Sequence, residues 1–192
     1  MALDLKNIQL QFSGPPDDVL GDYIRHIANG GLTRYRKFVQ YGNKEGQPLY
    51  AHVIDLVFTF VRLADFLDLS VVEQRVVMLA LSAHDINKIP GENKPLRFAD
   101  QATPQQVAPE LERLGADLFL ADWRDYIEDI CALIRAHGGH FHHAGLLFDV
   151  RRQNERFALG NERVRELSKL MKAFDTLDLS HSLGERQHNR PF

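Results

Sequence analysis

The chain has little of what marks secreted, membrane-spanning or strongly basic proteins. It contains a single cysteine, Cys131, so no internal disulfide can form, and this scarcity is typical of a reducing cytoplasm. No apolar run reaches the ~18 residues that a membrane helix needs, so we expect no membrane partner. The net charge is −3, which is not the balance of a general nucleic-acid-binding protein. An acidic chain can still cleave nucleic acid, because bound metal cations supply local positive charge.

The composition is that of an ordinary globular protein. Hydrophobic residues make up 44% of the chain and charged residues 26%, and 192 residues are enough for one domain with a buried core. We expect a single domain over residues 1–192, with an N-terminal arm at 1–16 and a polar tail at 183–192. Gly14-Pro15-Pro16 ends the arm.

The hydrophobic pattern predicts a mainly α fold, a helical bundle with minimal strand signal. A helix from Leu49 to Leu67 is apolar on nearly all faces, and Ser70 with Glu73 forms a capping box that starts an apolar run to Ile89. We expect these two helices to form the buried centre. Further helices are predicted from Asp17 to Ala28, from Thr103 with Gln106 in a second capping box, from a cap at Asp122 to about Ala136, and from a cap at Asn161 onward.

A histidine–aspartate pair stands near the end of the second central helix. The side chains of neighbours on a helix point about 100° apart, so His84 and Asp85 can flank one metal ion. A carboxylate can bridge two cations, and an imidazole binds one. Lys88 shares their face, where its ammonium would hold a phosphate oxygen or stabilise transition-state charge. The alternative is an ordinary surface pair of Asp85 and Lys88.

His52 lies on the first central helix. A lone histidine on an apolar helix is usually a core residue with one hydrogen bond. The next helix is expected to run antiparallel and carries His84 and Asp85, which makes metal ligation the favoured interpretation of His52.

The later part of the chain adds more candidate ligands. Four histidines lie within seven positions, and nearby glycines let the backbone turn so that several imidazoles converge; they are His137, His140, His142 and His143. Some of them are expected to bind metal, and the alternative is a polar loop of solvated histidines. Asp175 has apolar neighbours on the last helix, and a buried carboxylate needs a partner such as a metal.

This ordered set, from His52 to Asp175, resembles the HD superfamily of metal-dependent phosphohydrolases. The segments Leu49-Tyr50-Ala51-His52-Val53 and Ser82-Ala83-His84-Asp85-Ile86-Asn87-Lys88-Ile89 are similar to the N-terminal HD nuclease domain of the large subunit of type I-D CRISPR effector complexes, over roughly residues 45 to 182. The resemblance implies an HD-domain helical bundle. It implies that His52, His84, Asp85 and Asp175 are metal ligands, that His137, His142 and His143 complete the site, and that Lys88 is the phosphate-side lysine.

The implied activity is metal-dependent cleavage of DNA, chiefly single-stranded, during CRISPR interference, with other effector subunits and a helicase as partners. One or two divalent ions are expected, and Mn²⁺, Ni²⁺, Co²⁺ and Fe²⁺ suit imidazole and carboxylate ligands, with Mg²⁺ as a further candidate. His140, Arg151 and Arg152, with Arg156, would contact the substrate backbone, although a solvated charged segment explains the arginines equally well.

Two other functions stay open: an HD phosphohydrolase that acts on free nucleotides, and a non-catalytic docking module of a CRISPR complex. The subunit in that family is much longer and has a polymerase-like palm region downstream. We therefore expect this chain to be either an N-terminal fragment of a larger subunit or a stand-alone HD subunit. His137 and His142 also stand closer together than the corresponding motifs of CRISPR nucleases, which leaves the binding of a second ion open.

Overall fold

The computed structural model describes residues 9–38, 48–64, 66–89, 102–138 and 157–188, without the side chains of Asn87 and residues 175–188. Of the described residues, 74% are helical and none lies in a β-strand. The predicted mainly α fold is confirmed. None of the helices in these ranges combines the length and the apolar character that crossing a lipid bilayer would require.

Two helices form the centre of the molecule, α2 (Leu49–Ala64) and α3 (Val71–Ala83). Every residue of α3 from Val76 to Ala83 is buried, as expected for a central helix. Helix α2 was predicted to be apolar on nearly all faces, but it exposes Asp55 and Arg62 and so has one solvent face. The predicted central pair is therefore confirmed: α3 is buried along most of its length, and α2 has one face toward solvent.

Both central helices end earlier than predicted. Helix α2 stops at Ala64 instead of Leu67, and the chain then turns through Asp68, whose φ of 48° is left-handed. Helix α3 stops at Ala83 instead of Ile89. His84 is the C-cap residue of α3. Asp85 has non-helical backbone angles, φ −109° and ψ 23°, and a 3₁₀ turn, η4 (Ile86–Lys88), follows.

The predicted N-terminal helix is present in two pieces. Helix α1 (Val19–Tyr23) begins after Asp18, whose carboxylate accepts hydrogen bonds from the backbone N–H groups of Leu20 and Gly21. It continues as a π-helical turn, η2 (Ile24–Ala28), and a 3₁₀ helix, η3 (Gly31–Lys37), comes next. The start predicted at Asp17 was therefore wrong by two residues, because Asp18 supplies the capping oxygen.

The middle of the chain contains α4 (Pro104–Leu114), α5 (Ala116–Phe119), the 3₁₀ helix η6 (Trp123–Tyr126) and α6 (Ile127–Gly138). The second capping box is confirmed, since the Gln106 side chain accepts a hydrogen bond from the backbone N–H of Thr103 at 3.2 Å. Helix α5 was not predicted. The predicted cap at Asp122 was wrong, because its side chain makes no capping hydrogen bond to the 3₁₀ turn that precedes α6.

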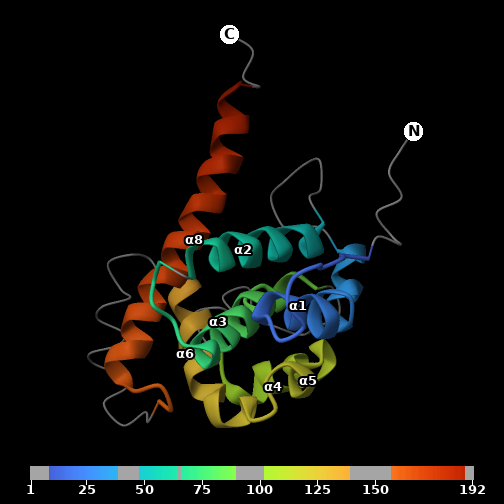
Figure 1. Cartoon of the computed structure of the whole chain (residues 1–192). Helices are drawn as coiled ribbons and strands as arrows, with labels where there is room; N and C mark the ends of the chain where they lie inside the picture. The colour runs from blue at the N-terminus through green and yellow to red at the C-terminus, as the bar shows by residue number, and fades with distance from the viewer. Residues whose placement is uncertain (1–8, 39–47, 65, 90–101, 139–156, 189–192) are drawn as a thin grey trace.

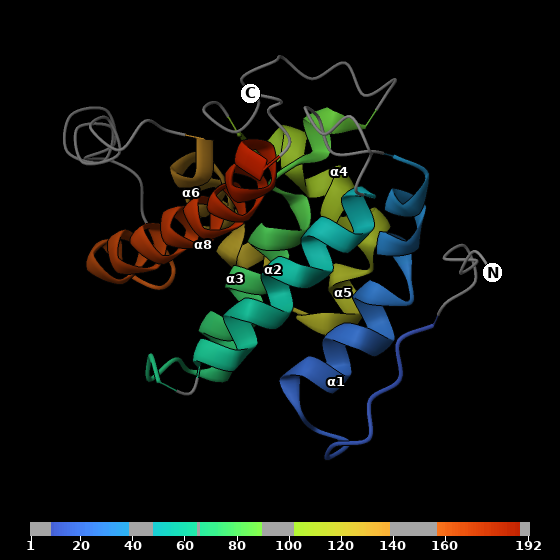
Figure 2. The same ribbon diagram turned by 90° about the horizontal axis from the view of Figure 1, so that it is seen from above.

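The last helix, α8 (Asn161–His188), is the longest in the described ranges. The carbonyl of Gly160 accepts the first helical hydrogen bond, from the N–H of Val164, so Gly160 holds the cap position predicted for Asn161. Residues 183–188, which were expected to belong to a polar tail, continue the helix. Figures 1 and 2 show α8 on one side of α2 and α3, with α1, α4 and α5 on the other.

Helices α6 and α8 pack against each other and run in the same direction. Near the start of α6, the buried carboxylate of Asp129 accepts hydrogen bonds from the backbone N–H groups of Ala158 and Leu159, at 3.0 and 2.9 Å, just before α8 begins. Near the end of α6, the Lys172 ammonium donates to the carbonyl oxygen of His137. The two helices are therefore joined by side chain to backbone hydrogen bonds at two levels.

Candidate metal centre

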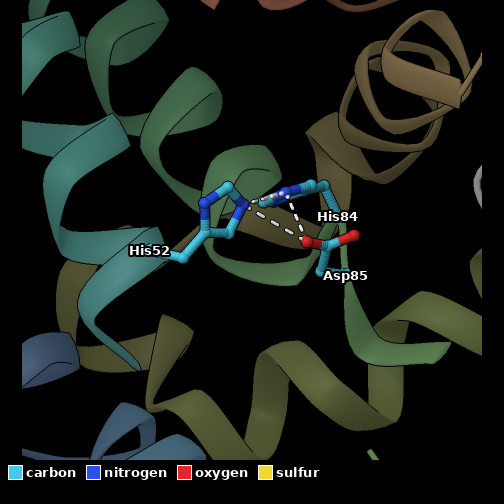
Figure 3. Close-up of side chains that lie close together, drawn as sticks. All are labelled: His52, His84 and Asp85. Carbon is cyan, nitrogen blue, oxygen red and sulfur yellow. Dashed lines mark hydrogen bonds and ion pairs between the residues drawn. The ribbon is translucent and has the colours of Figure 1, made fainter. Parts of the chain in front are cut away.

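Three side chains that were predicted to bind metal converge in the core. Figure 3 shows the imidazoles of His52 and His84 and the carboxylate of Asp85 pointing toward one another. The Nε2 atoms of His52 and His84 are 3.2 Å apart, and Asp85 Oδ2 lies 3.3 Å from the first and 3.1 Å from the second. All three residues are buried, with 4% or less of their surface exposed.

The ends of the central helices create this convergence. His52 lies in the first turn of α2 and His84 caps the end of α3; their contact shows that the two helices are antiparallel. His84 and Asp85 were predicted to be neighbours on one helix. That detail was wrong, because α3 ends before Asp85, and the changed backbone angles bring its carboxylate to the side on which the His84 ring lies.

A backbone contact sets the tautomer of His84. Its Nδ1 atom lies 2.6 Å from the carbonyl oxygen of Leu81. A carbonyl can only accept, so Nδ1 carries a proton, and Nε2 is the ring nitrogen that faces His52 and Asp85 and would bind an ion. Histidines that bind metal usually hold their other ring nitrogen in this way.

The carboxylate of Asp85 is held in its ionised form. Burial by itself would raise the pKa of Asp85, but the charge of His84, the hydrogen bonds from His52 and His84 and the charge of Lys88 outweigh burial and hold that pKa well below its usual value. The Lys88 Nζ atom lies 2.5 Å from Oδ2, and 19% of the Lys88 side chain is exposed. The pair is thus partly buried instead of lying on open surface.

His137 approaches the same carboxylate from α6. Its Nε2 atom is 4.0 Å from Asp85 Oδ1, and its ring meets the His84 ring edge to face with 4.3 Å between centroids. Burial lowers the pKa of His137 well below its usual value, and the neighbouring His84 lowers it further against the opposing effect of Asp85. His137 is therefore neutral, which is the form of histidine that binds metal.

The three donor atoms fit a divalent ion. Ligand distances of about 2.1 Å give spacings between ligands of about 3.0 Å in an octahedron and about 3.4 Å in a tetrahedron. The observed spacings of 3.1, 3.2 and 3.3 Å fall between these values. A buried polar cluster with only a structural role would bring little advantage over apolar side chains of the same volume.

Several predicted site residues lie outside the described residues: His140, His142, His143, Arg151, Arg152 and Arg156. Asp175 lies in α8, but its side chain is not among those described. Lys172 was not predicted, although it contacts the backbone of His137. No signal in the sequence identifies it, because it is one of several charged residues on a long helix.

Comparisons of the chain with protein-family models, with curated proteins and with solved structures found no significant match.

Proposed function

We propose that the chain is a metal-dependent phosphoester hydrolase with an HD-type site built on His52, His84 and Asp85. The observation that carries this proposal is the set of three buried donor atoms, from α2 and from the two residues that follow α3, spaced as the ligands of one divalent ion would be. When bound, such an ion would lower the pKa of water toward neutrality and polarise a phosphoryl oxygen.

Each protein side chain has a distinct part in this proposal. His84 would offer its Nε2 atom to an ion, with the ring oriented by the contact of Nδ1 with Leu81, and the carboxylate of Asp85 supplies negative charge. Lys88 is the group that reaches from the buried carboxylate toward solvent, and its ammonium would hold a non-bridging phosphate oxygen. His137 stands beside the second oxygen of Asp85, where a neutral imidazole would act as a further ligand.

We further propose DNA, chiefly single-stranded, as the substrate, and CRISPR interference as the setting, with the other effector subunits and a helicase as partners. The support is the resemblance of the segments around His52 and His84 to the HD nuclease domain of type I-D effector complexes. Free nucleotides are the competing substrate, since the same donor atoms would serve both.

The test is an assay of metal-stripped protein reconstituted with Mn²⁺, Co²⁺ or Ni²⁺ and given labelled single-stranded DNA, duplex DNA and a panel of nucleotides. We expect cleavage of single-stranded DNA by the wild type. The variants His84→Ala and Asp85→Asn should lose at least about 100-fold in rate, the effect typical of removing an electrostatic contribution to the transition state. His26→Ala is the matched control, because His26 lies on η2 and is not one of the three clustered donors.

The outcomes separate the alternatives. Cleavage of nucleotides alone would replace the nuclease proposal with nucleotide hydrolysis. A wild-type protein that binds none of the ions and hydrolyses nothing would contradict the proposed function and favour a docking module. Undiminished cleavage by His84→Ala would show that the reaction takes place elsewhere.

A further inference from the structure

One hydrogen bond links α8 to the candidate metal centre through the backbone. The Lys172 Nζ atom donates to the carbonyl oxygen of His137 at 3.1 Å. Helix α6 ends at Gly138, so this carbonyl is among the last four of the helix, which have no partner within it. An ammonium at this place also balances the negative end of the helix dipole. Lys172 therefore stabilises the last turn of α6, the part of a helix that frays most readily.

The position of Lys172 is itself fixed by core packing. Its neighbour Met171 is fully buried, and Phe174 is 2% exposed. The Phe174 ring meets Phe60 of α2 edge to face, with 5.8 Å between centroids. The part of α8 that carries Lys172 is thus anchored to the helix that carries His52. A lysine held in this way can fix the end of α6 relative to α2.

We propose that Lys172 is a positioning residue of the candidate metal centre. It holds the last turn of α6 so that the His137 imidazole stays beside Asp85 and against the His84 ring. The ammonium contacts the backbone of His137, so its effect passes through that residue. This inference rests on the proposed function, because it assigns Lys172 to the same site.

A comparison of three variants of the full chain tests the inference. Lys172→Met keeps the length of the side chain and removes the donor, Lys172→Arg keeps a charged donor, and Lys169→Met changes an exposed lysine one turn earlier on α8. Titration of metal-stripped protein with Mn²⁺ or Co²⁺ by calorimetry gives the affinity. We expect a loss of about 10-fold for Lys172→Met, the lower end of what outer-shell partners of metal ligands contribute. Lys172→Arg should recover most of it, and Lys169→Met should match the wild type.

A double-mutant cycle separates positioning from general stabilisation. In a His137→Ala background, Lys172→Met should cause no further loss of affinity, because the residue it acts through is gone. In metal-free protein, Lys172→Met should shift the imidazole NMR signals of His137, and Lys169→Met should leave them in place.

The inference is overturned if Lys172→Met binds the ions as tightly as the wild type or more tightly, if the loss persists in the His137→Ala background, or if the His137 signals do not move. Any of these results leaves the proposed function intact as long as the wild type binds metal and His84→Ala does not. A wild type that binds neither ion contradicts the proposed function itself.

Discussion

Replacing Asp85 by asparagine is the most direct test of the candidate metal centre. The substitution keeps the shape of the side chain and removes its charge. Asp85 Oδ2 lies 3.1 to 3.3 Å from both imidazole nitrogens, so the variant changes the one anionic donor among the three. An amide is a much weaker ligand than a carboxylate for a cation that also binds two imidazoles. Bound metal should therefore stabilise the wild type and have little effect on the variant.

The size of the effect follows from linkage between binding and folding. An ion present at 100 times its Kd adds about 2.7 kcal/mol to the free energy of unfolding. In a chain of 192 residues, each kcal/mol moves Tm by about 2–4 °C, so the wild type should gain about 5–11 °C. If the variant binds about 100-fold more weakly, the same ion concentration adds about 0.4 kcal/mol, which is about 1–2 °C.

Differential scanning calorimetry of metal-stripped protein, with and without Mn²⁺, measures this difference. The His26→Ala variant is the control and should show the wild-type shift. An equal shift in the wild type and in Asp85→Asn would refute the reasoning, because the ion would then bind away from the three donors. The absence of any shift in the wild type would do so as well.

Three further predictions concern the stability of helices α3 and α8, which pack around the candidate site. Ser70→Ala removes the acceptor for the Glu73 N–H at the start of α3 and should lower the free energy of unfolding by about 1 kcal/mol; an unchanged Tm would speak against the cap. Phe174→Ala removes the buried ring that packs on Phe60 and should cost about 3–5 kcal/mol in urea unfolding, whereas a loss below about 1 kcal/mol would show that α8 is not anchored there. Burial alone would raise the pKa of Glu73, but hydrogen bonds from Arg163 and Ser70 hold that pKa below its usual value. The ionised carboxylate of Glu73 therefore stabilises the folded state at neutral pH, and this stabilisation is lost as the pH falls below about 4.3. The difference in Tm between the wild type and Glu73→Gln should therefore shrink between pH 6 and pH 3, and a constant difference would contradict this.

Local signals in the sequence predicted the two capping boxes but not the ends of the two central helices. The capping boxes at Ser70 and Thr103 are contacts within three residues, so the sequence contains all of their partners. The end of α3 was missed because Ile86 and Ile89 are buried although they lie beyond the helix. A 3₁₀ turn can continue the burial pattern of an α-helix, so periodicity does not reveal the change between the two.

The candidate site was predictable in its residue types and less so in its geometry. His52, His84 and Asp85 are brought together as two antiparallel central helices would bring them. The bond from His84 Nδ1 to Leu81 depends on the side-chain rotamer at a helix end, which the pattern of residues does not specify. The contact of Lys172 with α6 joins residues 35 positions apart and depends on how two helices pack.

Two contacts hold α6 and α8 in a fixed register, the contact of Asp129 with Leu159 and the contact of Lys172 with His137. Asp129 holds the backbone at Leu159, and Lys172 reaches His137 from 13 residues further along. One extra residue within that stretch would rotate Lys172 by about 100° around the helix axis and carry it away from its acceptor. A change of chain length between Asp129 and His137 or between Leu159 and Lys172 would therefore break one of the two contacts, and the length of these two helical stretches sets where Lys172 lies relative to the candidate metal centre.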